Sequence, residues 1–434
     1  MAHRLLSLRR APRRWLGALL AYPAPVEVRR SAAWSLLEGA LGSVSAGVLG
    51  GFLGVYVVRL GGDALLVGLS AALPALLGSL VQPWAVRLTA RQGARRLMLR
   101  AALVARAGLL LLTLFPLLPV PGVLRAWALV AGYALANAAA TVALVAWTVV
   151  VARIFPGHLR GRLFADRNLF VSLTTLLGTL LAGLLLDLLG TRAGSAAALF
   201  LGGATALASW FALRRLGPPD APEAEAEEAP AEGGMRVALA ALGRPLPRLV
   251  FAGGSLFQLG LMLPAAAYPI FYVRMLHLPG AWISAISVGS SLAAIATSRL
   301  WGVWHDRRGV LWTYAASTAL FLAVPAVFSW ARSPWLLLLA NSVTGVGAAG
   351  YALASFNAVL AVARPGERAA LVALFNLLLY ALAALAPMLG TALLPRAGVP
   401  GLFLAAAAGR AGGALLFVWA RRRWGEPGPA TPSA

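Results

Sequence analysis

Long uninterrupted apolar runs are the feature of this sequence that most restricts its fold. Each run has about 20 residues or more, enough for a helix to cross roughly 30 Å of hydrocarbon. We expect twelve such helices, at 32–58, 64–86, 97–118, 127–154, 169–189, 193–213, 249–273, 281–303, 310–330, 335–363, 371–394 and 398–420. Barrel strands would alternate apolar and polar residues, and the runs show no such alternation. The sequence therefore predicts an all-α integral membrane protein.

The composition agrees with a membrane location and argues against a soluble nucleic-acid-binding protein. Of 434 residues, 60% are hydrophobic and 12% are charged, whereas soluble domains have about 25% charged residues. The formal net charge is +23, and all 37 basic residues are Arg. These Arg residues form short clusters between apolar runs rather than one continuous basic face, so we expect no nucleic-acid partner.

Residue types that are missing from the sequence exclude several kinds of chemistry. The chain has no Lys and no Cys, which excludes a Walker A lysine, a Schiff base, a disulfide and a thiolate nucleophile. Its four His residues, His3, His158, His277 and His305, are scattered singly without metal-ligand spacing. We therefore expect no cofactor, no metal site and no enzymatic activity.

The distribution of Arg among the loops predicts the orientation in the membrane. Arg residues crowd the N-terminal tail, every second loop and the C-terminal tail. The opposite loops contain one Arg each: Arg59, Arg125, Arg192, Arg274, Arg332 and Arg396. By the positive-inside rule, both termini are expected in the cytoplasm, with the chain in the plasma membrane, the inner membrane of a two-membrane cell.

Polar segments divide the chain into five regions. Residues 1–31 are basic and predict a cytoplasmic amphipathic segment, with a signal peptide as the alternative. The stretch "LGPPDAPEAEAEEAPAEGG" opens an acidic cytoplasmic linker at 216–248, which separates six-helix regions at 32–215 and 249–420. A short surface helix is expected late in this linker, and 421–434 forms a cytoplasmic tail.

The two six-helix regions contain an internal repeat. "FPGHLRGRLFADRN" follows the fourth expected helix, and "RPGERAALVALFN" follows the tenth, with the same spacing from Arg to Asn. "VRLTARQGARR" and "GVWHDRRGVLW" follow the second and eighth helices and superpose on Gly93 and Gly309. Such a repeat is typical of secondary transporters.

At this point the sequence resembles the major facilitator superfamily. Gly302, Asp306, Arg307 and Gly309 match the G-x-x-x-D-R-x-G loop of that family. The resemblance implies two six-helix bundles related by pseudo-two-fold symmetry. It also implies a monomeric carrier that moves a small solute across the bilayer by alternating access, with these loops as a cytoplasmic gate.

The gate loop of the first half departs from the family pattern. Its counterparts of Gly302 and Asp306 are Val86 and Ala90, so the retained positions are Arg91, Gly93 and Arg95. For the loop of the second half, the alternative interpretation is that Arg307 and Arg308 only anchor it on the cytoplasmic side.

Charged residues inside the expected helices are candidates for ion coupling, since a charge in the bilayer is costly. The resemblance implies that the first, fourth, seventh and tenth helices line the central cavity, which makes Glu38 in the first a proton- or cation-handling candidate. Arg106 lies at similar depth and is its candidate partner, with snorkelling to the surface as the alternative. Arg410 lies near mid-depth without an evident acidic partner. Asp187 lies at the outer end of the fifth expected helix, where we expect it at the surface of the bilayer.

Neutral polar and aromatic residues in the cavity helices are candidate solute ligands. They are Asn137, Thr141, Trp147, Gln258, Tyr268, Asn341, Thr344, Tyr351 and Asn357. Each is equally interpretable as a contact between helices. The mostly apolar lining favours a small amphipathic or hydrophobic solute.

Three functions remain open from the sequence. The first is a secondary active transporter, with proton coupling as one option. The second is a permease driven by a separate ATPase. The third is a facilitator-like membrane protein that has lost transport and acts as a sensor or scaffold, which the eroded first-half loop permits.

Overall fold

The computed structural model describes residues 25–155, 157–217, 234–364 and 366–427, and within these ranges every regular element is a helix. The expected all-α fold is therefore confirmed. Most of the predicted N-terminal segment, the acid-rich part of the predicted linker and the end of the tail lie outside the described residues.

The first half of the chain contains five helices and one 3-10 segment. In order they are α2 (Val26–Arg59), α3 (Ala64–Gln92), α4 (Ala94–Leu111), η1 (Leu112–Leu117), α5 (Gly122–Ile154) and α6 (Gly157–Arg214). The helix α2 begins at Val26, before the expected start at 32. The difference arises because its first turns, "VEVRR", are polar, and a polar helical extension has no hydropathy signal.

In the second half, the helices are interrupted more often. It comprises α7 (Gly234–Ala241), α8 (Pro245–Met262), η2 (Leu263–Ala266), α9 (Ala267–Ile270), η3 (Phe271–Met275), α10 (Gly280–Arg308), α11 (Val310–Leu320), α12 (Ala323–Phe328), α13 (Pro334–Val362) and α14 (Arg368–Trp424). The short helix α7 lies where a surface helix was expected late in the linker.

Ten helical segments of the described chain are long and apolar enough to span a membrane. Two of these, α6 and α14, are interrupted at Gly190 and Gly398, whose positive φ values of 74° and 64° break the helix. A side chain on Gly194 would collide with the backbone of Leu185 and Leu186, which places the chain after Gly190 back against the chain before it. Gly190 falls between the fifth and sixth expected spans, and Gly398 is the first residue of the twelfth. Both interruptions support a count of twelve, which stays a prediction.

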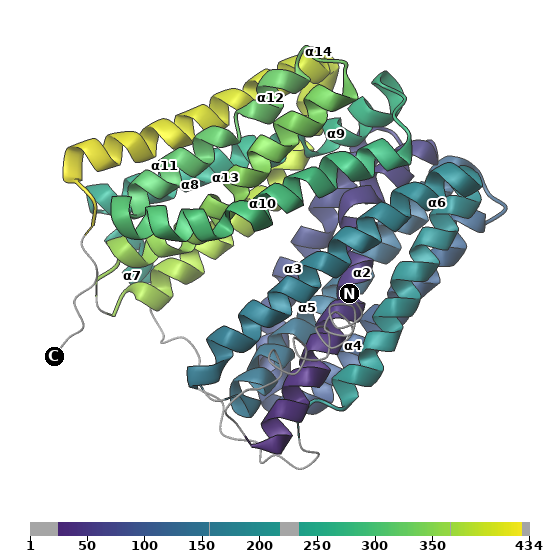
Figure 1. Ribbon diagram of the computed structural model, residues 1–434, viewed down its shortest axis with the longest axis horizontal. Helices are drawn as coiled ribbons and strands as arrows, with labels where there is room; N and C mark the ends of the chain where they lie inside the picture. The colour runs from purple at the N-terminus through teal and green to yellow at the C-terminus, as the bar shows by residue number, and fades with distance from the viewer. Residues whose placement is uncertain (1–24, 156, 218–233, 365, 428–434) are drawn as a thin grey trace, which may run out of the picture.

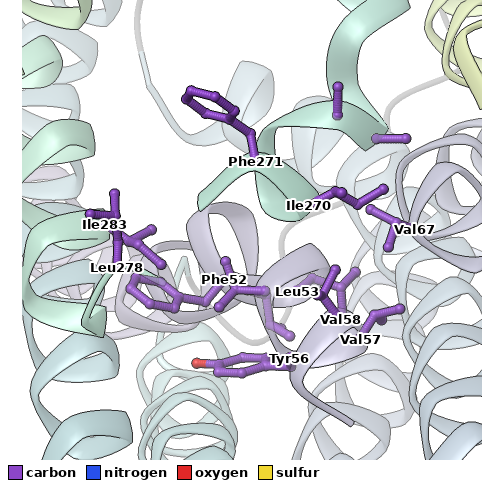
Figure 2. Close-up of a cluster of buried hydrophobic side chains, with 14 of the residues drawn as sticks. Phe52, Leu53, Tyr56, Val57, Val58, Val67, Ile270, Phe271, Leu278 and Ile283 are labelled. Atoms are coloured by element: carbon purple, nitrogen blue, oxygen red, sulfur yellow. The ribbon is translucent and has the colours of Figure 1, made fainter. Parts of the chain in front are cut away.

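The two halves form separate bundles that meet at one end (Figure 1). Of four buried apolar clusters, the largest combines both halves, and each of the others lies within one half. Figure 2 shows this shared cluster, in which Phe52 and Tyr56 of α2 lie near Ile270, Leu278 and Ile283 of the second half. We call the end of the molecule that contains this shared cluster the closed end. It lies at the C-terminal end of α2 and the N-terminal end of α10, away from the Arg-rich loops.

Arg410 of α14 fastens two broken helices of the second half. Its side chain is 1% exposed. Nε donates to the Gly260 carbonyl at 3.1 Å, Nη1 to the Phe321 carbonyl at 2.7 Å and Nη2 to the Tyr268 hydroxyl at 3.1 Å. Gly260 lies just before the 3-10 segment at Pro264, and Phe321 lies between α11 and α12. The guanidinium thus binds neutral oxygens where helical hydrogen bonding is disturbed.

Candidate functional site

An ion-paired carboxylate lies in the middle of the first bundle. Glu38 is 12 residues into α2, about 18 Å along the helix at 1.5 Å per residue. Its Oε1 accepts a hydrogen bond from Arg106 Nη2 at 2.6 Å, and its Oε2 accepts one from Arg167 Nη2 at 2.9 Å. The side chains of Glu38, Arg106 and Arg167 are 10%, 13% and 19% exposed. The structure therefore pairs Glu38 with Arg106, as the sequence suggested.

Arg167 is a member of this site that the sequence did not indicate. Its position near the N-terminal end of α6, after an Arg-rich loop, made it one of many positive-inside residues. The helix carries it inward beside α2. In the structure, a Cβ at Gly39 would lie 3.0 Å from Arg167 Nε. Gly39 thus gives the guanidinium room to cross the surface of α2.

Trp147 of α5 supports Arg167 from the other side. The Arg167 guanidinium carbon lies 4.8 Å from the centre of the Trp147 ring, a distance at which the ring face attracts a cation. Phe164 packs edge-on against the same ring, with ring centroids 5.9 Å apart. Of the predicted solute ligands, Trp147 is the one that joins Glu38 and Arg106 at this site.

These four side chains border a cavity of about 310 Å³ inside the first bundle. The other lining residues are mainly small or apolar: Gly39, Gly42, Ser43, Met98, Ala102, Ala105, Leu109, Ala140, Ala143, Leu144, Val171, Ala206 and Leu213. They come from α2, α4, α5 and α6. The volume lies near the lower end of the roughly 300–1,000 Å³ typical of ligand pockets.

Three hydrogen-bond donors around this cavity have no protein acceptor among the described residues. They are Arg106 Nη1, Arg167 Nε and Trp147 Nε1, and all three are buried. A buried donor without a partner costs about 1–3 kcal/mol. With Glu38 ionised, the two guanidiniums also leave one positive charge unbalanced.

The other predicted solute ligands of the first half make contacts within the protein. Asn137 Nδ2 donates to the Pro74 carbonyl of α3 at 3.1 Å, and Thr141 Oγ1 donates to the Asn137 carbonyl at 3.0 Å. These contacts fit the alternative interpretation, in which polar residues connect or brace helices.

Most of the predicted ligands in the second half also have protein partners. Tyr351 donates to Gln258 Oε1 at 3.5 Å, Tyr268 accepts from Arg410, and Asn341 Nδ2 donates to the Leu337 carbonyl at 3.4 Å. Thr344 has a buried hydroxyl without a partner among the described residues, and Asn357 is half-buried. The structure does not bring these residues to the cavity beside Glu38.

The predicted gate loop of the second half joins α10 to α11. Gly309 has φ 88°, which a glycine adopts readily, and it ends one helix and begins the next. Asp306 and Arg307 are exposed, and Gly302 is half-buried. The N-terminus of α11 binds the carboxylate of Glu426, which accepts from the backbone N–H groups of Leu311 and Trp312, both at 2.9 Å. A gating role for Asp306 and Arg307 stays a prediction.

The gate loop of the first half has a related contact. Gly93 has φ 82° and separates α3 from α4, while Arg91 is exposed. Arg95 Nη2 donates to the Arg214 carbonyl at 2.9 Å, and Nη1 donates to the Gly217 carbonyl at 3.4 Å. In each half, therefore, residues at or just after the end of the last helix bind the start of the helix that follows the gate loop.

Asp187 at the end of the first part of α6 binds across the two halves at the closed end. Its Oδ1 and Oδ2 accept from the backbone N–H groups of Gly280 and Ala281, at 2.6 and 2.7 Å. These groups begin α10, whose N-terminus attracts negative charge. Nearby, Arg274 Nη2 donates to the Gly62 carbonyl at 2.6 Å. The closed end is thus held by polar bonds as well as by apolar packing.

Comparison with known proteins places the chain in a large transporter family. The family described as Major Facilitator Superfamily matches residues 36–288 and 250–433. No curated protein matches the chain by sequence.

Solved structures of transporters share the fold. The nucleoside transporter NupG is 14% identical, with a TM-score of 0.67 over 91% of this chain and 99% of that chain. A bacterial homologue of the human lysosomal transporter Spinster, inward-facing and unoccupied, is 14% identical, with a TM-score of 0.64 over 91% and 95%. A bacterial homologue of the iron transporter ferroportin, in an inward-facing state, is 14% identical, with a TM-score of 0.65 over 90% and 98%.

Proposed function

Because this chain belongs to the major facilitator superfamily and is a transmembrane transporter, we propose that it moves a small solute as a secondary active transporter by alternating access. One observation carries the proposal: among the described residues, the one buried apolar cluster that both bundles share lies at one end. A carrier of this type needs two bundles that close at one end while the solute site communicates with the other.

The contacts at the closed end suit a gate that opens. They comprise a few polar bonds and one apolar cluster, and the polar bonds include Asp187 to the α10 N-terminus and Ser284 Oγ to the Thr179 carbonyl at 2.8 Å. The Arg-rich loops lie at the other end. If these loops face the cytoplasm, as the positive-inside rule indicates, the protein has an inward-facing form.

The solute site in this proposal is the cavity beside Glu38. It contains the charged cluster within the first bundle, and its free donors offer binding groups that the protein itself leaves unused. The remaining predicted ligands are largely engaged with other protein groups, so they position helices in this account.

Proton coupling is the second part of the proposal, and Glu38 is its candidate group. Both Glu38 oxygens are bonded to guanidiniums. Protonation would change the charge of the cavity by one unit and release a donor for the solute. The binding of a proton and of a solute would then affect each other through the same two arginines.

The test uses purified protein in liposomes that enclose a pH-sensitive dye, without ATP. We expect pooled small solutes to include one that moves across the membrane and changes the internal pH. Solute movement without a pH change would contradict proton coupling but not secondary transport. A strict requirement for ATP and a partner protein would contradict secondary transport. Glu38→Gln should abolish the pH change at a temperature where the variant is folded.

A further inference from the structure

The geometry beside Glu38 points to an organic anion as the solute: we propose that the cavity binds a monocarboxylate with a short apolar body. This inference rests on the proposed role of the cavity in transport. It is carried by the charge, the unpaired donors and the apolar lining of this one cavity.

The charge of the cluster is the first observation. Two guanidiniums and one carboxylate meet through bonds of 2.6 and 2.9 Å, and Glu38 is the acidic residue among the lining side chains. One positive charge is left in a site with low exposure to water. Unbalanced charge in such a place is costly, and a bound monoanion would make the cavity neutral.

Three unpaired donors on the lining side chains are the second observation. Arg106 Nη1, Arg167 Nε and Trp147 Nε1 are buried, lack an acceptor among the described residues and belong to side chains that line the cavity. All three can only donate hydrogen bonds, so the missing partner is an acceptor. Carboxylate oxygens are strong acceptors, and guanidinium binds them with favourable geometry.

The rest of the lining determines the body of the solute. Met98, Leu109, Leu144, Val171 and Leu213 present apolar surface to the same cavity of about 310 Å³. A hydrocarbon chain or ring fits this surface, whereas a second charged group would have no partner there. A monoanion also matches the single excess charge better than a dianion does.

Binding to the purified full-length protein in detergent tests the proposal. Hexanoate and hexanamide have the same carbon chain and differ in charge, so isothermal titration of each isolates the contribution of the anion. We expect hexanoate to bind about tenfold more tightly than hexanamide, since hydrogen bonds to charged groups are the stronger ones. Succinate and inorganic phosphate serve as dianion probes and should bind more weakly than hexanoate.

Two variants connect this binding to the site. Arg167→Gln removes the excess charge and leaves Glu38 paired with Arg106, so the ligand-free variant should melt at the same temperature as the wild type or higher. Its affinity for hexanoate should nevertheless fall by about tenfold or more. Trp147→Phe keeps a ring beneath Arg167 but removes the indole N–H, and we expect a loss of about threefold or more. Arg299→Gln, on the exposed surface of α10, is the control and should bind normally.

Several outcomes would overturn the anion site. Equal binding of hexanoate and hexanamide would do so, as would unchanged hexanoate affinity in Arg167→Gln. Tighter binding of succinate or phosphate would contradict a monocarboxylate. Hexanoate binding without any solute flux in liposomes would leave the anion site standing and contradict transport. Flux of neutral solutes without hexanoate binding would support transport and contradict the anion site.

Discussion

At the scale of single residues, Glu38 and its two arginines form the site on which the account depends. A carboxylate and a guanidinium lose hydration when they are buried, and their mutual attraction compensates only if both are well bonded. Glu38 has both oxygens bonded, whereas each arginine retains an unused donor. The two arginines, rather than Glu38, therefore lack hydrogen-bond partners, and a solute can supply the missing acceptors.

We predict that Glu38→Gln destabilises the protein by about 3–5 kcal/mol, because it leaves two buried guanidiniums without a carboxylate. The measurement is denaturant unfolding of the purified protein in detergent. Glu27→Gln in the same helix α2 is the matched control, since Glu27 is exposed, and its effect should be within about 0.5 kcal/mol. Similar stabilities for the two variants would contradict a structural ion pair at Glu38.

The sequence predicted part of this site. A carboxylate inside an apolar run is costly, which singled out Glu38, and the depth of Arg106 made it the candidate partner. Arg167 could not be recognised in the same way, because a long side chain near a helix end is usually solvated. Its inward position depends on the packing of α6 against α2 and on the space above Gly39. Such a contact between distant segments has no local sequence signal.

At the scale of helical elements, Arg410 explains how broken helices are tolerated in the second half. Its three donors bind the Gly260 and Phe321 carbonyls and the Tyr268 hydroxyl. In lipid, a backbone oxygen that loses its helical partner must find another donor. Hydropathy had marked Arg410 as a charge without an acid, and the structure shows that its partners are neutral oxygens.

We predict that Arg410→Met destabilises the second half by about 3–5 kcal/mol, because two backbone carbonyls and a hydroxyl lose their donor. Hydrogen exchange should increase around residues 260–268 and 318–323. Arg410→Lys should recover only part of the loss, since one ammonium cannot reproduce the planar fork. Arg396→Met, at an exposed position of the same element α14, is the control. Unchanged exchange in Arg410→Met would contradict the role of Arg410 as a fastener.

The sequence predicted the turn of each gate loop but not the contacts of the helix that follows it. Glycine at 93 and 309 correctly marked the two turns, and both have positive φ. The sequence did not indicate that Glu426 binds the N-terminus of α11. Glu426 follows the last helix of its half and is far from α11 in sequence. Only the packing of the bundle brings them together.

At the scale of the whole molecule, the apolar runs predicted an all-α membrane protein, and the resemblance to the major facilitator superfamily implied two helical bundles. They did not predict which end is closed, because the same amphipathic and apolar patterns serve both conformations of a carrier. The choice depends on contacts such as Asp187 with Gly280, and on the shared cluster around Phe52 and Phe271. These contacts join residues far apart in sequence and are specific to one state.

The most direct test of the account measures both ends of the protein at once. The chain has no cysteine, so spin labels can be placed on cysteine pairs introduced without removing any other thiol. One pair, Arg91→Cys with Arg307→Cys, reports on the Arg-rich loops. The other, Leu188→Cys with Trp335→Cys, reports on the closed end, and all four positions are exposed.

Alternating access predicts opposite changes in these two distances. When a transported solute is added to the protein in a bilayer, the pair on the Arg-rich loops should gain a shorter population while the pair at the closed end gains a longer one. The same populations should exchange together as solute concentration is varied. Two distances that stay fixed, or that shorten together in the presence of a solute that the protein transports, would contradict the account.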